Sequence, residues 1–186
     1  MEPSLPPRGV ELVLLLVVMT AALYDVRYRR IPNWLTAGGA GLGLALNAFL
    51  SQARAGMFKA SLIGFGVAFA VYFALYALRA MGGGDAKLMA AVGAIVGWPN
   101  WLFLFLVTSI LGGIMGIILV VLRKRLKTTL LNVGFILNEM KSGRPAYAGK
   151  AELDVRSPKA VGLPHGAVIA IGTLFFLALV RHLANQ

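Results

Sequence analysis

Two aspartates stand at the edges of apolar stretches, where a charged side chain is costly. The chain has seven acidic residues, and Asp25 and Asp85 are the two placed in this way. An ionisable residue in a membrane segment is a functional candidate by default, because it costs roughly 2.5–3.5 kcal/mol or more there. Two close carboxyl groups share a proton, so one can activate water while the other donates to a carbonyl oxygen. Asp25 and Asp85 are therefore candidate catalytic residues for acid–base chemistry that needs no cofactor.

A purely structural interpretation of both aspartates stays open on the local sequence. Asp25 has Arg27 and Arg29 nearby, and Asp85 has Lys87 two residues on. Because buried charges are usually paired, each aspartate could form a salt bridge and perform no chemistry.

Three glycines, Gly82, Gly83 and Gly84, come directly before Asp85. Glycine costs about 1 kcal/mol relative to alanine in a helix, so the run predicts an open backbone ahead of a helix N-terminus. A substrate strand can approach such a backbone closely and pair with it. We expect the three glycines to bind substrate, and a plain loop is the alternative.

A short polar turn follows Asp25. Pro32 disfavours helix at the residue before it and ends the first helical segment. Asn33 is a natural N-cap for a second helix. The two residues predict a tight helical hairpin.

The last apolar stretch opens with Pro164, His165 and Gly166. A lone histidine near a membrane interface is usually a hydrogen-bonded structural residue, and His165 is interpreted in that way. With no cysteine and two histidines in the chain, we expect neither a disulfide nor a metal centre.

Composition predicts a membrane protein. Hydrophobic residues make up 59% of the chain and charged residues 13%, with a mean hydropathy of +0.79, whereas soluble domains carry about 25% charged residues. The net charge is +11, and the basic residues lie between the apolar runs. Contact with lipid headgroups therefore explains them better than binding to nucleic acid. We expect no nucleic-acid partner.

The apolar runs predict an all-α protein with six transmembrane helices and an uncleaved first helix. Pairs of glycines four residues apart, including Gly39/Gly43 and Gly93/Gly97, predict close helix packing. The fourth run is shorter than the usual span of about 20 residues. The expected helices cover residues 10–26, 34–50, 60–78, 86–97, 101–122 and 161–180.

Basic residues set the expected orientation. With both termini outside, 14 of the 18 lysines and arginines fall on cytosolic loops, as the positive-inside rule favours. The cytosolic loop 123–160 contains apolar residues at helical spacing between basic ones, which predicts an amphipathic helix on the membrane surface. From helix rise and bilayer thickness, Asp25 and Asp85 should lie at matching depth and face each other across a cavity open to the cytosol.

Two blocks around the aspartates resemble a known family. The stretch 25–36, Asp-Val-Arg-Tyr-Arg-Arg-Ile-Pro-Asn-Trp-Leu-Thr, resembles the first catalytic block of type IV prepilin peptidases. The stretch 82–91, which contains Gly-Gly-Gly-Asp-Ala-Lys, resembles their Gly-x-Gly-Asp block and includes Lys87. Residues 163–167, Leu-Pro-His-Gly-Ala, look like their C-terminal Pro-aromatic-Gly segment, with a histidine where an aromatic is common.

The resemblance implies an aspartic endopeptidase of the bacterial inner membrane, acting at the cytosolic face with Asp25 and Asp85 as its catalytic pair. Its substrates and partners would be prepilins or pseudopilins, whose short leader it removes, together with membrane lipids. Larger members carry a cysteine-rich insert and also methylate the new N-terminus. Without cysteine or room for that insert, this chain is similar to the short, peptidase-only members of tight-adherence (Flp-type) pili.

Three other functions are weighed against this one. A presenilin or signal-peptide-peptidase type also pairs Tyr-Asp with Gly-x-Gly-Asp, but those proteins are longer and have a Pro-Ala-Leu block. A proton-coupled transporter would need polar residues across the membrane, and the outer halves of these segments are nearly all apolar. A non-catalytic pilus-assembly subunit is separated from the peptidase only by a cleavage assay.

Overall fold

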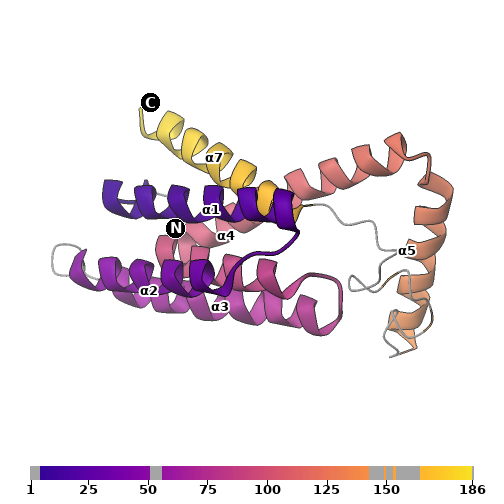
Figure 1. Cartoon of the computed structure of the whole chain (residues 1–186), viewed down its shortest axis with the longest axis horizontal. Coiled ribbons are helices and arrows are strands. Elements are labelled where there is room, and N and C mark those ends of the chain that lie inside the picture. Colours follow the sequence, from indigo (N-terminus) through magenta and orange to yellow (C-terminus); the bar gives the residue numbers. More distant parts are fainter. Residues whose placement is uncertain (1–4, 51–55, 143–148, 150–152, 154–163, 186) are drawn as a thin grey trace.

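The computed structural model describes residues 5–50, 56–142, 149, 153 and 164–185, and its regular structure in those ranges is entirely helical. Figure 1 shows α1, α2, α3, α7 and the first part of α4 gathered into one bundle, while α5 stands apart at one end. The all-α prediction is confirmed. The helices are α1 (Arg8–Tyr28), α2 (Asn33–Leu50), α3 (Met57–Ala77), α4 (Gly83–Leu122), α5 (Leu126–Lys141) and α7 (His165–Ala184).

Four helical segments are long and apolar enough to cross a membrane in the part of the chain that the structure describes. They are Arg8–Tyr28, Met57–Ala77, Trp98–Leu122 and His165–Ala184. Four of the six predicted spans therefore qualify by length and composition. The other two, α2 and the first part of α4, are helices, but their crossing stays a prediction.

The fourth and fifth predicted helices form one kinked element, α4. The backbone leaves the helical region at Gly97 (φ 77°, ψ 164°), a conformation that glycine adopts at little cost. The gap left between the two predicted helices, residues 98–100, is helical, and the break lies at Gly97. Pro99 fits because a proline is tolerated in the first turn of a helix. The predicted start at residue 86 is also late, since α4 begins at Gly83.

A buried asparagine from α2 stabilises the kink. In a regular helix the carbonyl of Ile95 would accept the N–H of residue 99, but Pro99 has none. The Asn47 side chain instead donates from Nδ2 to the carbonyls of Ile95 (2.8 Å) and Ala94 (3.3 Å). The first part of α4 can therefore end inside the bundle with these carbonyls satisfied.

Glycines let the helix backbones approach closely, as the sequence predicts. The backbones of Gly64 on α3 and Gly93 on α4 touch, so a Cβ at either position would collide with the other's carbonyl oxygen. A Cβ on Gly43 would lie 2.7 Å from the Ile95 side chain, and one on Gly39 would lie 2.9 Å from Val17. In lipid the hydrophobic effect contributes little to helix association, so close backbone contacts of this kind hold the helices together.

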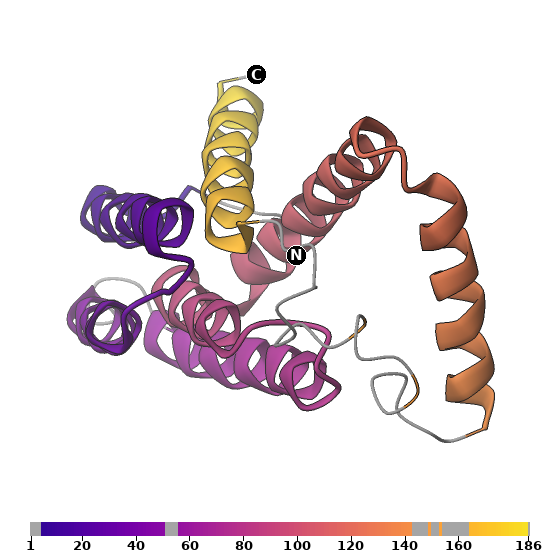
Figure 2. The same ribbon diagram turned by 45° about the vertical axis from the view of Figure 1, so that its right-hand side comes forward.

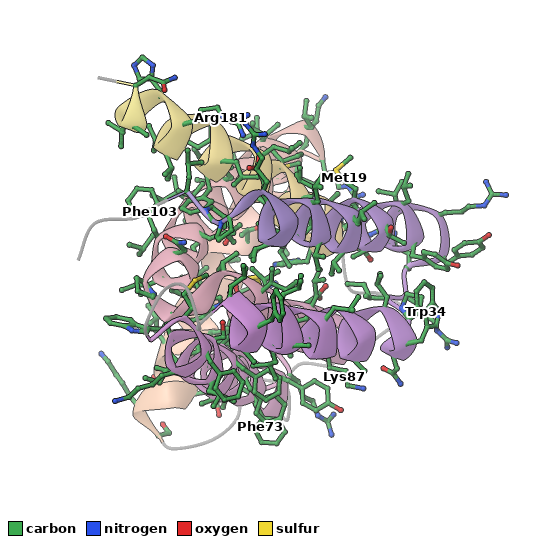
Figure 3. All side chains as sticks on the ribbon, turned by 90° about the vertical axis from the view of Figure 1, so that its left-hand side faces the viewer. Met19, Trp34, Phe73, Lys87, Phe103 and Arg181 are labelled. Carbon is green, nitrogen blue, oxygen red and sulfur yellow. The ribbon has the colours of Figure 1, made fainter. Side chains whose placement is uncertain are left out.

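Helices α1 and α7 run side by side in opposite directions. At one end of the pair, Arg181 Nη2 donates to Glu11 Oε1 at 2.7 Å; Arg181 is labelled in Figure 3. Buried side chains such as Leu14, Val18 and Phe176 belong to the core cluster around this pair. Because the start of α1 meets the end of α7, the end of α1 lies beside the start of α7.

Helix α5 stands away from the bundle in Figures 1 and 2. Within the predicted loop 123–160 the chain is helical over Leu126–Lys141, and the place of this helix on a membrane surface stays a prediction. Its apolar residues Leu126, Leu130, Val133 and Leu137 are exposed. Apart from Gly149 and Leu153, the remainder of the predicted loop after residue 142 lies outside the described residues.

The Gly64–Gly93 contact makes a stability prediction. Gly64→Ala should lower the thermal midpoint of the purified protein in detergent, because the added methyl group meets backbone and overpacking costs about 1–3 kcal/mol. Gly66→Ala is the matched control on the same helix, because a Cβ there meets nothing within 4 Å. Equal midpoints for the two variants, measured by tryptophan fluorescence, would contradict the close packing.

Candidate active site

Asp25 lies near the end of α1 and is held by the start of α7. Its side chain is 8% exposed, and its Oδ2 accepts a hydrogen bond of 2.7 Å from the backbone N–H of Gly166. The first N–H groups of a helix lack partners within it and favour a negative charge. A Cβ at residue 166 would lie 2.9 Å from the Asp25 Cβ. The predicted motif residue Gly166 therefore contacts a candidate catalytic aspartate directly, which spacing in the sequence could not reveal.

Asp85 lies in the first turn of α4, close to Asp25 and to the start of α7. It interacts electrostatically with Asp25 and with His165, and it is hydrogen bonded to the backbone of Gly82. The two aspartates come from helix ends on the same side of the bundle. The structure thus brings together the pair that the sequence singles out, and it adds His165, which the sequence assigns only a structural role.

The salt-bridge interpretation fails for Lys87. Its Nζ donates to Asn33 Oδ1 at 2.9 Å, not to Asp85. Arg27 donates from Nε to the hydroxyl of Tyr28 at 3.2 Å and lies over its ring. Within the described ranges, neither candidate aspartate forms an ion pair with a basic side chain.

The Lys87–Asn33 hydrogen bond joins the two sequence blocks. It connects the first turn of α4 to the first residue of α2, so these two predicted motif residues do lie together. The predicted N-cap role of Asn33 is wrong, because its side chain accepts from Lys87. The carbonyl of Pro32 instead accepts the N–H groups of Leu35 (3.2 Å) and Thr36 (3.4 Å). Pro32 is therefore the residue directly before α2, and its carbonyl accepts the first hydrogen bonds of that helix.

The glycine run is less open than the sequence suggests. Gly83 and Gly84 already belong to the first turn of α4, and the backbone is extended only at Gly82 (φ −72°, ψ 146°). What the three glycines provide is room. A Cβ would lie 3.0 Å from Asp85 Oδ2 at Gly82, 3.1 Å from the Tyr76 ring at Gly83 and 3.3 Å from Ile31 at Gly84.

Tyr72 is a polar neighbour of Asp85 that the sequence analysis misses. It is buried in α3, hydrogen bonded to the side chain of Thr108, and interacts electrostatically with Asp85. Together with His165 and Met81 it lines a cavity of about 240 Å³. The signal that could have drawn attention to it is a tyrosine in the long apolar stretch of α3 after Ser61.

Comparison with known proteins gives one family. A model of the type IV leader peptidase family matches residues 12–117, which include both aspartates. Prepilin leader peptidase/N-methyltransferase of Escherichia coli (strain K12) is 34% identical over 119 residues, covering 61% of this chain and 52% of that protein. Preflagellin peptidase of Methanococcus voltae is 30% identical over 91 residues, covering 48% and 38%. The matches thus span about half or less of these relatives. No solved structure matches.

The link between the two blocks can be tested directly, because the chain has no native cysteine. The double variant Asn33→Cys/Lys87→Cys should be bridged by a short bifunctional thiol reagent. In the parent chain Lys87 Nζ and Asn33 Oδ1 lie 2.9 Å apart. The pair Leu42→Cys/Lys87→Cys is the control, because Leu42 lies more than two turns further along α2 and is exposed. Mass spectrometry that finds no bridge in the first pair, although both thiols react with a monofunctional reagent, would refute the arrangement.

Proposed function

The chain belongs to the type IV leader peptidase family, and on that premise we propose that it is an aspartic endopeptidase that removes the leader peptide of type IV prepilins. One observation carries the proposal. Asp25 and Asp85, far apart in sequence and with no lysine or arginine partner in the described ranges, interact with each other beside the first turn of α7. Burying two carboxyl groups at one place in a membrane bundle is costly, and shared proton chemistry explains why both are there.

The proposed mechanism uses the two aspartates as a unit. At moderate pH the pair holds one proton. The ionised carboxylate takes a proton from a water molecule, and the resulting hydroxide attacks the scissile carbonyl carbon. The protonated carboxyl donates its proton to the carbonyl oxygen. The carboxyl group that took the proton from water then gives it to the amide nitrogen as the C–N bond breaks. Either aspartate can fill either role.

The surrounding backbone orients this pair. The Gly166 N–H holds one carboxyl oxygen of Asp25, which leaves the other to face the substrate. Gly82 is the extended residue before α4, and we propose that it pairs with the substrate backbone. Gly83 and Gly84 keep that approach free of side chains. Fixed geometry of this kind lowers the barrier by removing the entropy of orientation.

The proposed substrate class is the Flp-type prepilin, processed in the bacterial inner membrane. The names of the two relatives refer to prepilin and preflagellin. In this chain α1 passes to α2 through residues 29–32, and there is no cysteine, which supports the peptidase-only form. Because the cytosolic loops are basic, recognition of the substrate would depend on its apolar and acidic parts rather than on a basic leader.

The proposed topology has six spans, with both termini outside and the site facing the cytosol. The Glu11–Arg181 ion pair marks one end of the bundle. The aspartates, the Lys87–Asn33 bond and the basic residues after α1 lie toward the other end. Helix α5, with exposed leucines and flanking bases such as Lys127 and Lys141, would lie on the cytosolic membrane surface.

Replacing either aspartate should abolish cleavage. Asp25→Asn and Asp85→Asn keep the side-chain shape but cannot exchange the proton, and general acid–base catalysis supplies about a hundredfold or more. Cleavage of a purified Flp-type prepilin in nanodiscs should therefore fall by at least that factor, with folding checked by gel filtration. Glu139→Gln, on α5 away from the bundle, is the control for the loss of a carboxylate and should cleave normally. Near-normal cleavage by both aspartate variants would make the aspartates structural.

Single cysteines test the topology. Lys141→Cys, at the end of α5, and Asn185→Cys, after α7, should be labelled from opposite sides of inner-membrane vesicles by an impermeant maleimide. Labelling at residue 141 should require access to the cytosolic side, as the distribution of bases predicts. Labelling of both residues from the same side would overturn the six-span arrangement.

A further inference from the structure

A groove runs along the bundle and ends at Asn33 and Lys87, two residues of the sequence blocks that contain the aspartates. Its volume is about 530 Å³, and it lies between α2 and α3 with α4 beneath. The lining residues repeat at helical spacing, so the groove follows the helix axes. They include Ala37 and Ala40 of α2, Phe65 and Phe69 of α3, and Lys87 and Ala90 of α4. We refer to it as the α2–α3 groove.

One wall of the groove is an aromatic ridge that leads to the glycine run. Phe65 and Phe69 are 36% and 43% exposed, and their rings stack with centroids 6.2 Å apart. The stack continues from Phe69 to Phe73 (5.4 Å). Phe73 then contacts the tilted ring of Tyr76 (6.2 Å), which packs over Gly83. From Phe65 to Tyr76 the ridge covers roughly 16 Å along the helix at about 1.5 Å per residue, so it links the middle of α3 to the residues just before Asp85.

The opposite wall and the floor have very short side chains. Ala37, Ala40 and Ala90 leave the backbones of α2 and α4 near the surface, and small residues are what allow another helix to pack closely in lipid. The lining of the groove changes from apolar to polar at one end. There Lys87, hydrogen bonded to Asn33, makes it polar at the level of the first turn of α4. Figure 3 shows Lys87 and Phe73 on the same side of the bundle.

This polarity indicates what occupies the groove. An apolar helix can lie along the alanines and phenylalanines but should end at Lys87, where the surroundings become polar. The peptide that adjoins it then lies next to Gly82–Asp85. Asp25 is nearly buried, so a peptide bond must enter the bundle to reach it. A substrate whose apolar segment already lies in lipid can do so sideways, without moving that segment into water.

We propose that the α2–α3 groove docks the transmembrane apolar helix of the prepilin substrate and aligns the adjoining peptide bond with Asp25 and Asp85. The proposal rests on the peptidase function above and adds to it the surface that recognises the substrate. It identifies Ala37, Ala40, Phe65 and Phe69 as binding residues that do not touch the reacting atoms.

Filling the groove tests the proposal with two substrates. One is full-length prepilin in nanodiscs of phosphatidylethanolamine and phosphatidylglycerol, and the other is a synthetic peptide that spans the cleavage junction but lacks the apolar helix. Ala40→Trp should slow prepilin cleavage at least about tenfold more than peptide cleavage, because a mismatched side chain in a pocket changes kcat/KM by factors of this size. Leu42→Trp is the control on the same helix, since Leu42 is 57% exposed and does not line the groove.

A cross-linking measurement covers the case in which Ala40→Trp fails to fold. Ala40→Cys, combined with Asp25→Asn to prevent cleavage, should form a disulfide with single cysteines placed along the apolar helix of the prepilin. Cross-links should recur every three or four residues on one face of that helix. Leu42→Cys should give none of these cross-links.

The outcomes separate the groove from the activity. Equal slowing of both substrates by Ala40→Trp, or slowing of neither, overturns the groove and leaves the peptidase function intact. Disulfides between two copies of the Ala40→Cys chain, with none to prepilin, also overturn it, because the groove would then bind a second copy. A wild-type protein that cleaves neither substrate rejects the peptidase function itself, and the groove proposal with it.

Discussion

The hydrogen bond from the Gly166 N–H to Asp25 is the interaction on which the arrangement of the site depends. A carboxyl group at 8% exposure in an apolar bundle needs a donor, and the first turn of α7 provides one. That donor reaches Asp25 only because residue 166 has no Cβ. It also requires α1 and α7 to pair in opposite directions, which the Glu11–Arg181 ion pair supports at their far ends. A charged side chain that would be costly in lipid thus becomes part of the contact between the first and last helices.

The position of Asp85 follows from a helix that stops early. The first part of α4 reaches from Gly83 only to the break at Gly97, which is shorter than the roughly 20 residues of a full span. Asn47 makes that break tolerable by binding the carbonyls of Ala94 and Ile95. Close contact of Gly64 with Gly93 and of Gly43 with Ile95 then packs this short helix between α2 and α3. With the break packed inside the bundle, the first turn of this short helix, and Asp85 with it, lies beside Asp25.

Lys87 contributes to the site without neutralising it. A lysine two residues after an aspartate looks like its counter-ion, yet Lys87 binds Asn33 and leaves Asp85 to interact with Asp25 and His165. The same bond closes the polar end of the α2–α3 groove. The basic side chain therefore separates the apolar surface from the aspartates. This division fits a peptidase whose substrate is partly embedded in lipid and partly exposed to water.

The sequence alone determined the helices and the two aspartates. Apolar runs of this length can satisfy their backbone polar groups in lipid only as helices, and acidic residues are so rare here that Asp25 and Asp85 stand out. The gap between the predicted helices at residues 98–100 is helical, and the break lies at Gly97, where Asn47 on another helix binds the carbonyls of Ala94 and Ile95. Asn33, predicted as an N-cap, accepts from Lys87, and the glycine run provides room for Tyr76 and Ile31 rather than a long extended backbone. Each of these outcomes depends on a contact between residues far apart in the chain. Local periodicity and propensity carry no information about such contacts, so only the packing of the helices could decide them.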